Sequence, residues 1–331
     1  MLINIACSNR KQPQKPISLE PVKRMLEPND STFMGDIGGI KYANNRLYLA
    51  DNSPQVLQLG PDLDLLGRIK ENGKGPGEFT TVMDMSIVND SLYLYDRQQA
   101  KILVYNHNNN FIWEVRLPEA SGYDMVVGNC SQIFLSTPNR EYPITKFNSH
   151  GQKISAFGHK TVSNESNQYR RNWRFLFIHN DKLIAIAKSE PLLEVYSLEG
   201  QFIRKADIAP PEIHDLIERV KRENESYGKK QPINSLNLIF IAAAVYKDSI
   251  YLLEAKRPKE NTNIYDTKFT YLFKYKLEAD GNITLDQTFK LFRSDRDKLL
   301  YGFRLEVVED HTLIVYDLMG KNLLVYKDKH L

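Results

Sequence analysis

The chain has 331 residues, of which 42% are hydrophobic and 26% are charged, the composition of an ordinary globular protein rather than a disordered one. Its 44 basic and 41 acidic residues give a formal net charge of +3, and the two signs are interspersed, which argues against a nucleic-acid partner. With two cysteines and no Cys/His cluster at metal-ligand spacing, a structural zinc site is not indicated either.

The first residues, "MLINIACSN", resemble the end of a bacterial lipoprotein signal, in which an apolar run stops at the cysteine that is acylated. Only six residues precede Cys7, so this interpretation requires a start further upstream. The following "SNRKQPQKP" has no packing pattern. We expect residues 1–16 to be a truncated signal and tether, which places the protein in the periplasm or at the outer membrane, held only by a lipid on Cys7. The alternative is a cytoplasmic protein whose N-terminus is genuine.

One pattern, a polar turn followed by an apolar or alternating strand, recurs six times along the chain. Successive copies are 45, 41, 50, 67 and 63 residues apart, and their strands start at Leu47, Leu92, Ile133, Leu183, Ile250 and Leu313. The shorter intervals match the roughly 40–50 residues of a four-stranded propeller blade.

Every copy has similar neighbours. A strand precedes it through an Asn-Asp type turn, which tolerates left-handed backbone, and further strands follow. The last copy stops after its third strand, "NLLVYKDKHL", whereas "ISLEPVKRML" at residues 17–26 is a spare strand before the first copy. Pairing the two would close the ring and remove open sheet edges. The sequence therefore predicts that residues 17–331 form one all-β domain, a six-bladed β-propeller of four-stranded antiparallel blades closed by an N-terminal strand.

Two insertions account for the long intervals. Residues 211–228 place apolar side chains at i, i+3, i+4 and i+7, with Pro211 near the start and Gly228 at the end, which predicts an amphipathic helix. Its apolar stripe would seal a gap in the propeller, or the helix would act as a lid or as a docking element for a partner. Residues 256–270 are expected to form a polar loop between the second and third strands of blade five.

Residues 68–106 carry the most specific pattern in the chain. The corner "GKGPGEF", with Gly75, Gly77, Glu78 and Phe79, precedes a strand that ends at Asp96 and a third strand, "KILVYN". This combination resembles the NHL repeat, and the whole chain resembles NHL-repeat-like (TolB-like) six-bladed propellers, a group that includes bacterial lipoproteins mostly without assigned function. The resemblance implies binding more often than catalysis.

The same corner also has the glycine content of a phosphate-binding loop. However, a strand and not a helix follows Phe79, so the helix N-terminus that would hold an anion is missing. We interpret the glycines as permitting positive φ where the chain crosses between two blades, with Phe79 buried between them.

Charged residues at the starts of the inner strands are the candidate site, because propeller ligands usually lie over the central channel. The repeat alignment brings these residues from five blades toward the channel mouth: Asp36, Asp84, Asp124, Arg174 and Arg304. Such a ring would suit a polar or zwitterionic ligand, or a metal such as Ca²⁺ held by the carboxylates. Aspartates at strand starts also cap turns through their own backbone, which would leave no ligand site.

Motifs of hydrolases and of nucleotide-binding enzymes are absent from the sequence. We therefore predict a non-catalytic binding or scaffold propeller that recognises a peptide, a glycan or a protein partner over the channel and needs no cofactor. The alternative is a metal-dependent lactonase or lyase with carboxylate ligands on the channel axis. Gluconolactonase-like and amidating-lyase propellers, which this chain resembles in blade number, imply that alternative.

Overall fold

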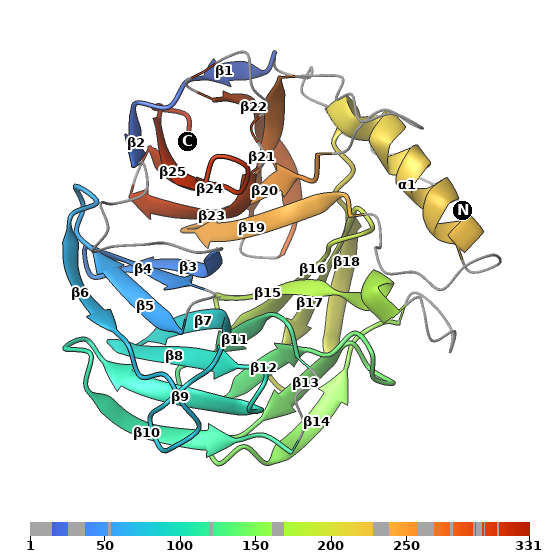
Figure 1. The fold of residues 1–331 in the computed structure, drawn as a ribbon. Helices are drawn as coiled ribbons and strands as arrows, with labels where there is room; N and C mark the ends of the chain where they lie inside the picture. Colours follow the sequence, from blue (N-terminus) through green and yellow to red (C-terminus); the bar gives the residue numbers. More distant parts are fainter. Residues whose placement is uncertain are drawn as a thin grey trace.

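Six β-sheets, each with four antiparallel strands, surround a central channel and form a β-propeller (Figure 1). The computed structural model describes residues 15–25, 37–51, 54–118, 122–160, 169–227, 238–256, 268–278, 281–293, 295, 300, 302–309 and 311–331. Figure 1 shows the first strand of each sheet at the centre of the ring and the fourth at its rim. The predicted fold class is confirmed, including the number of blades.

The first three blades follow one another along the chain, each with four strands. Blade one contains β3 (Ile37–Ala43), β4 (Arg46–Asp51), β5 (Gln55–Leu59) and β6 (Leu65–Ile69). Blade two contains β7 (Val82–Val88), β8 (Ser91–Asp96), β9 (Lys101–Asn106) and β10 (Phe111–Arg116). Blade three contains β11 (Met125–Val127), β12 (Ile133–Ser136), β13 (Ile144–Phe147) and β14 (Lys153–Phe157).

The other three blades include the N-terminal strands. Blade four contains β15 (Arg174–His179), β16 (Lys182–Ala187), β17 (Leu192–Ser197) and β18 (Phe202–Asp207), after a 3₁₀ turn, η1 (Tyr169–Asn172). Blade five contains β19 (Phe240–Tyr246), β20 (Ser249–Glu254), β21 (Phe269–Leu277), β22 (Ile283–Phe292) and β1 (Ile17–Leu19). Blade six contains β23 (Gly302–Glu309), β24 (Thr312–Asp317), β25 (Asn322–Lys327) and β2 (Lys23–Met25).

The turns between first and second strands have the backbone that the Asn-Asp pattern predicted. Both central residues have positive φ in three of these turns, with values between 47° and 61°: Asn44, Asn45, Asn89, Asp90, Asn180 and Asp181. Asparagine and aspartate tolerate this region better than other non-glycine residues, and tight hairpins need it because it matches the twist of the strands. The dipeptide therefore sets the register of these three inner hairpins.

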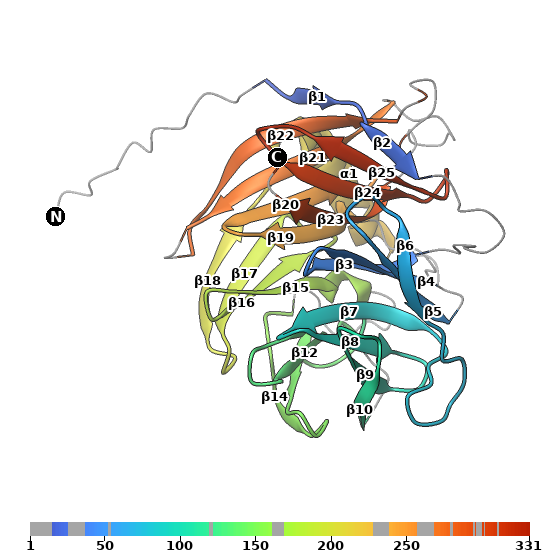
Figure 2. The ribbon, with the colours of Figure 1, turned by 90° about the vertical axis from the view of Figure 1, so that its left-hand side faces the viewer.

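The N-terminal segment closes the ring in two steps. Strand β2 pairs antiparallel with β25 and supplies the missing outer strand of blade six, as the sequence predicted. Strand β1 pairs in parallel with β22 and adds a fifth strand to blade five, which the repeat pattern did not indicate. Figure 2 shows β1 and β2 lying along these two neighbouring blades. One segment therefore covers the sheet edges of two adjacent blades.

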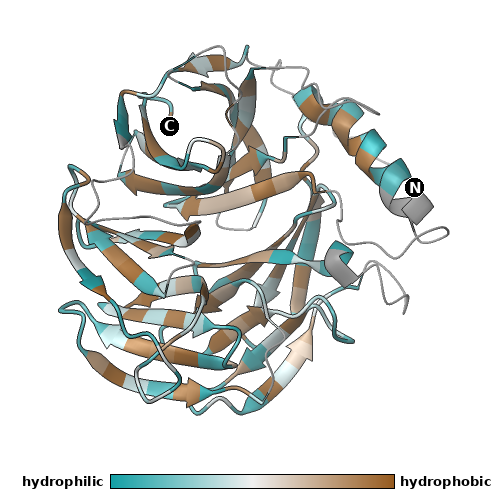
Figure 3. Ribbon diagram, viewed as in Figure 1, coloured by the Kyte–Doolittle hydropathy of each residue, from teal (hydrophilic) through white to brown (hydrophobic). Residues whose placement is uncertain are grey.

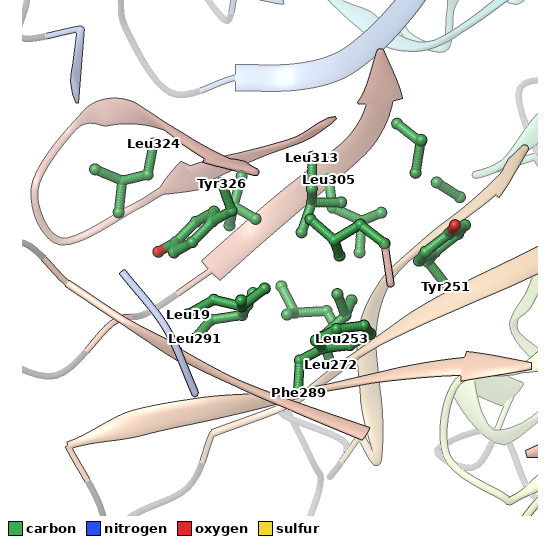
Figure 4. Packing of buried hydrophobic residues seen from close by; sticks show 14 of the residues in the cluster. Leu19, Tyr251, Leu253, Leu272, Phe289, Leu291, Leu305, Leu313, Leu324 and Tyr326 are labelled. Atoms are coloured by element: carbon green, nitrogen blue, oxygen red, sulfur yellow. The ribbon is translucent and has the colours of Figure 1, made fainter. Parts of the chain in front are cut away.

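The hydrophobic core is divided among the contacts between neighbouring blades. Each cluster of buried side chains contains residues from two adjacent sheets, such as the set between blades five and six in Figure 4. Leu19 of β1 belongs to that set, beside Phe289 and Leu291 of β22. Figure 3 shows the corresponding hydrophobic residues along the strands. Because every blade packs against two others, burial between blades stabilises the ring as a whole.

The corner "GKGPGEF" joins blades one and two. Gly77 has a φ of +75°, and the Glu78 carboxylate accepts a hydrogen bond from the Gly75 N–H at 2.7 Å. The buried Lys101 ammonium donates to the Gly75 carbonyl at 2.9 Å, so blade two holds the corner in place. Phe79 is fully buried in the cluster between the two blades, as predicted. The interpretation of this corner as a crossing between blades is confirmed.

The predicted helix is present and packs against blades four and five. It begins with a 3₁₀ turn, η2 (Pro211–Ile213), and continues as α1 (His214–Tyr227), outside the ring of strands in Figure 1. Ile213, Ile217 and Val220 are buried and join the cluster that contains Phe240 and Phe273. The helix therefore seals apolar surface between two blades, as the first interpretation of its stripe expected. Within the described residues, no helix is both long enough and apolar enough to cross a membrane.

Candidate functional site

A pocket of about 360 Å³ opens over the central channel and receives residues from all six blades. We call it the mouth pocket, and its lining comes from the starts of the inner strands. It includes Ile37–Lys41, Thr81, Met83–Asp84, Tyr123–Met125, Trp173, Phe175–Phe177, Lys188, Ile241–Ala243 and Phe303–Leu305. Its volume lies in the range of small-molecule sites, which are about 300–1,000 Å³. The predicted residues Asp84, Asp124 and Arg304 are therefore brought together.

Asp84 connects blades two and three. One carboxylate oxygen accepts a hydrogen bond from the Met85 N–H at 2.8 Å, and the other accepts one from the Met125 N–H at 2.7 Å. Burial raises the pKa of Asp84, the Lys41 charge opposes that shift, and the nearby Asp124 charge adds to it. Because both oxygens receive backbone N–H groups, this carboxylate fixes the start of β11 against β7.

Asp124 connects blades three and four in a similar way. Its oxygens lie 2.9 and 3.0 Å from the Lys188 Nζ, and one of them also accepts a hydrogen bond from the Trp173 Nε1–H. The Lys188 ammonium lies 4.0 Å from the centre of the Trp173 ring and 4.1 Å from that of Phe175. Burial lowers the pKa of Lys188, and the Asp124 carboxylate opposes this shift. Asp124 and the two rings thus form a cage that the protein's own lysine fills.

An aromatic wall continues from this cage toward blade two. The centres of the Tyr123 and Trp173 rings lie 4.6 Å apart, and the Arg97 guanidinium lies 4.0 Å from the centre of the Tyr123 ring. Arg97 also donates a hydrogen bond to the Tyr123 hydroxyl at 3.0 Å. Two neighbouring rings, each in contact with one cation, thus form an aromatic side of the pocket.

Arg304 and Lys41 are the cations of the mouth pocket that lack a close carboxylate partner among the described residues. The Arg304 Nε–H donates to the Gly38 carbonyl at 2.8 Å and an Nη1–H to the Phe303 carbonyl at 3.1 Å. Burial lowers the pKa of Arg304, and the nearby charges of Asp124 and Asp84 oppose that shift. The Lys41 Nζ comes no closer than 3.9 Å to an acidic oxygen, that of Glu306. Arg304 is thus held by carbonyl oxygens, and Lys41 has one long ion pair, with Glu306.

Arg174, expected at the channel mouth, is not part of the pocket lining. Its buried side chain forms an ion pair with Glu194, with 3.2 Å between Nε and Oε2. Its other N–H groups donate to the carbonyl oxygens of Arg171 and His159. Arg174 therefore stabilises the inside of blade four, and the structure does not bring it to the candidate site.

The strand ladders explain why Arg304 reaches the channel and Arg174 does not. Asp84 pairs with Tyr95, Phe175 with Ile186 and Arg304 with Tyr316, so these three residues hold equivalent positions on their inner strands. In β23 a register shift between Val307 and Glu309 brings Arg304 to this position, whereas β15 pairs without irregularity and Arg174 lies one residue before Phe175, outside the pocket lining. A bulge moves each following side chain to the other face, which a repeat alignment alone does not reveal.

Other predicted site residues lie outside the described part of the chain, and several lining residues were missed. Asp36 and Cys7 belong to the first group, so their roles stay predictions. Cys130, the other cysteine, is exposed and unpaired. Lys41 lies two residues beyond the aligned position in blade one, and period-two alternation along the inner strand would have found it. Lys188 follows the end of β16, and no sequence signal pointed to it.

Comparisons with known proteins support the fold. A family model described as "DUF5128: 6-bladed beta-propeller" matches residues 22–132. No protein with a curated description matches the chain. A Bacteroides fragilis protein, named "Putative exported protein", is similar in structure with a TM-score of 0.56 and 14% identity, over 91% of this chain and 88% of that one.

Two further solved structures have a similar fold. The WD40 repeats of RRP9 superpose with a TM-score of 0.55 and 10% identity, over 96% of this chain and 99% of that one. A catalytically inactive virginiamycin B lyase from Staphylococcus aureus, solved with quinupristin, gives a TM-score of 0.53 and 11% identity, over 92% and 98% of the two chains. At these identities the similarity concerns the fold and not the function.

Proposed function

We propose that this protein is a non-catalytic binding propeller whose mouth pocket receives an anionic group, such as a carboxylate, of a peptide, glycan or protein partner. The observation that carries the proposal is the difference between the acids and the cations of the pocket. Asp84 and Asp124 are occupied by backbone N–H groups, Trp173 and Lys188, whereas Arg304 donates to carbonyl oxygens and the acidic oxygen nearest to Lys41, that of Glu306, is 3.9 Å away.

The orientation of Arg304 favours a planar anion. Its Nε–H and one Nη1–H are used by carbonyl oxygens, which leaves the other Nη1–H and the Nη2 group for a ligand. A guanidinium edge of this kind matches the two oxygens of a carboxylate. The Phe303 ring, 4.2 Å from the guanidinium, and the wall formed by Tyr123 and Trp173 would contact the apolar body of the ligand.

The charge of the pocket supports the same ligand class. Three cations, Lys41, Lys188 and Arg304, and two acids, Asp84 and Asp124, line it, so the described lining has a formal excess of one positive charge. A monoanion would neutralise this excess, whereas a free cation would meet repulsion.

The metal-dependent alternative finds less support in this geometry. Among the residues that the structure describes, no three histidine, cysteine, aspartate or glutamate side chains gather in a way that would hold a metal ion. The two carboxylates expected to act as ligands already accept hydrogen bonds on both oxygens. Metal analysis of the purified protein tests this alternative directly, because stoichiometric Ca²⁺ or Zn²⁺ lost in Asp84→Ala would favour the enzyme.

We further propose that the protein acts outside the cytoplasm as a lipoprotein anchored through Cys7. The apolar run before Cys7 and the polar tether after it support this location, as does the similar Bacteroides fragilis protein, which carries "exported" in its name. Incorporation of radiolabelled palmitate into the full-length protein, and its loss in Cys7→Ser, is the expected result. An unlabelled, cytoplasmic protein would contradict this location.

Anion binding is tested with three probes of nearly equal shape, namely benzoate, benzamide and benzylamine, by isothermal titration calorimetry. We expect only benzoate to bind, and we expect Arg304→Met to weaken it by at least about tenfold, because hydrogen bonds to charged groups contribute about 1.5–3 kcal/mol. Lys41→Met should act in the same direction even if the Arg304 variant folds poorly. The control is Lys327→Met, which changes an exposed lysine of β25 outside the pocket.

Equal binding of benzamide and benzoate would overturn the proposal, as would wild-type affinity for benzoate in both pocket variants. If the proposal holds, arrays of peptides and glycans with free or esterified carboxylates would identify the partner class. Esterification should abolish binding, since it removes the charge while the shape is largely kept.

A further inference from the structure

A second cavity continues the channel below the mouth pocket. This lower chamber has a volume of about 240 Å³ and is lined by the later residues of the inner strands. The two cavities share Lys41, Met125, Leu176 and Phe177, so they meet around the Lys41 side chain. A charge placed in one cavity is therefore within reach of the charges in the other.

Glu306 is the acidic residue in the lining of the lower chamber. It is 8% exposed, and its closest cation is the Lys41 Nζ at 3.9 Å, at the outer limit of an ion pair. Arg304 precedes it by two residues on β23, and both line the channel, so their Cα atoms lie about 7 Å apart. Glu306 thus lies directly below the cations that would hold the anion.

Few polar groups face Glu306 from the other inner strands. Strand β3 contributes Lys41 and Tyr42, and β7 contributes Ser86, with Asp84 above it in the mouth pocket. The chamber lining from β11, β15 and β19 is apolar: Met125, Val126, Leu176, Phe177, Ile178 and Val245. Burial raises the pKa of Glu306 to about 7, with the Asp84 charge acting in the same direction and the Lys41 charge in the opposite one. Near neutral pH this carboxyl group is therefore present in both forms.

The Lys41 charge interacts either with Glu306 in the lower chamber or with an anion in the mouth pocket. When Glu306 is ionised, Lys41 interacts with it, and an anion in the mouth pocket meets the repulsion of a buried carboxylate. When Glu306 is protonated, that repulsion disappears, and the Lys41 charge is available to the ligand. Among the described residues, six charged groups line the two cavities: Lys41, Lys188, Arg304, Asp84, Asp124 and Glu306. Their summed formal charge is zero when Glu306 is ionised and +1 when Glu306 is protonated.

We propose that an anion entering the mouth pocket is bound together with a proton that Glu306 takes up from solvent, so that ligand affinity rises as the pH falls. This inference rests on the proposed function, because it concerns the same pocket. The direction follows from linkage: the ligand favours the protonated form of Glu306, and the protonated form favours the ligand to the same extent. Affinity should therefore decrease, by at most tenfold per pH unit, as the pH rises through neutrality.

The test is calorimetric titration of the wild-type protein with benzoate between about pH 6 and pH 8, where benzoate itself remains ionised. Repeating the titration in two buffers of different ionisation enthalpy measures the protons taken up on binding. We expect uptake of a substantial fraction of one proton near neutral pH and a several-fold loss of affinity across the range. No proton uptake in the wild-type protein, with measurable benzoate binding, would overturn the inference.

Two variants separate Glu306 from other titrating groups. Glu306→Gln mimics the protonated carboxyl group and should bind benzoate with an affinity that does not depend on pH. Glu309→Gln is the matched control, because Glu309 lies three residues further along β23, is exposed and accepts a hydrogen bond from the Tyr42 hydroxyl outside the mouth pocket. The Glu309→Gln variant should keep the wild-type pH dependence of benzoate affinity. An unchanged pH dependence in Glu306→Gln would assign the proton to another group.

The outcomes distinguish this inference from the function on which it rests. Benzoate binding that is independent of pH would leave the anion site intact and remove only the role of Glu306. Absence of benzoate binding at every pH, in both the wild-type protein and Glu306→Gln, would overturn both proposals together.

Discussion

Replacing Asp84 by alanine tests whether the acids of the channel hold blades together or hold a ligand. The substitution removes the acceptors of two N–H groups, those of Met85 and Met125, which belong to buried residues of neighbouring blades. Each buried donor left without a partner costs about 1–3 kcal/mol. The loss of unfolding free energy is partly offset, because folding of the variant no longer removes a carboxylate from water. Burial of this carboxylate is unfavourable in the wild-type protein, as the raised pKa of Asp84 indicates. We expect Asp84→Ala to lower the free energy of unfolding by about 2–4 kcal/mol.

This magnitude predicts a measurable change in melting temperature. At about 2.1 cal/mol/K of unfolding entropy per residue, a chain of 331 residues loses roughly 1.5 °C for each kcal/mol. Differential scanning calorimetry should therefore show a decrease of about 3–6 °C for Asp84→Ala. The control is Asp286→Ala, which changes an exposed carboxylate of β22, 3.8 Å from Lys274, and should alter the unfolding free energy by less than about 0.5 kcal/mol.

The calorimetric experiment should be repeated with a chelator. If Asp84 acts only through the two N–H groups, the difference between the wild-type protein and Asp84→Ala will be the same with and without EDTA. Two results would refute this reasoning: a melting temperature unchanged by Asp84→Ala, or a difference that disappears when EDTA destabilises the wild-type protein alone.

Two further substitutions test the corner between blades and the helix. Gly77→Val should lower the free energy of unfolding by about 2–4 kcal/mol, because the residue has a φ of +75° and its Cβ would lie 3.1 Å from the Phe111 ring. Gly77→Ala should lower it by less. Calorimetry should detect no ATP binding in either variant or in the wild type. Ile217→Ala should cost about 2–4 kcal/mol in urea unfolding, because the side chain is buried between α1 and blades four and five. Detectable ATP binding would contradict the interpretation of the corner as a crossing between blades. If Ile217→Ala leaves stability unchanged but alters benzoate affinity, the helix acts as a lid rather than as packing.

Local sequence patterns determined the architecture, because each of the six blades is built from strands and tight turns that are neighbours in the sequence. The Asn-Asp turns define hairpins whose residues are neighbours in the chain, and alternating strands define which side chains face the next blade. The missing fourth strand of the last repeat and the spare strand at residues 17–26 predicted the closure, since an unpaired edge is unfavourable. The pairing of β1 with β22 had no such signal, because its three residues carry no periodic pattern.

The candidate site depended on tertiary structure, because its residues lie far apart in sequence and their orientation depends on single-residue irregularities. The register shift between Val307 and Glu309 in β23 placed Arg304 at the channel position that Phe175 holds in β15, and Arg174, one residue before Phe175, lies inside a blade. The aspartates that the sequence suggested as ligands are used as bridges between blades, which only their contacts with Met125 and Lys188 reveal. The sequence by itself thus determined a closed ring with charged residues at its mouth, and the packing of the blades decided which of those residues line the channel and which neighbouring groups they contact.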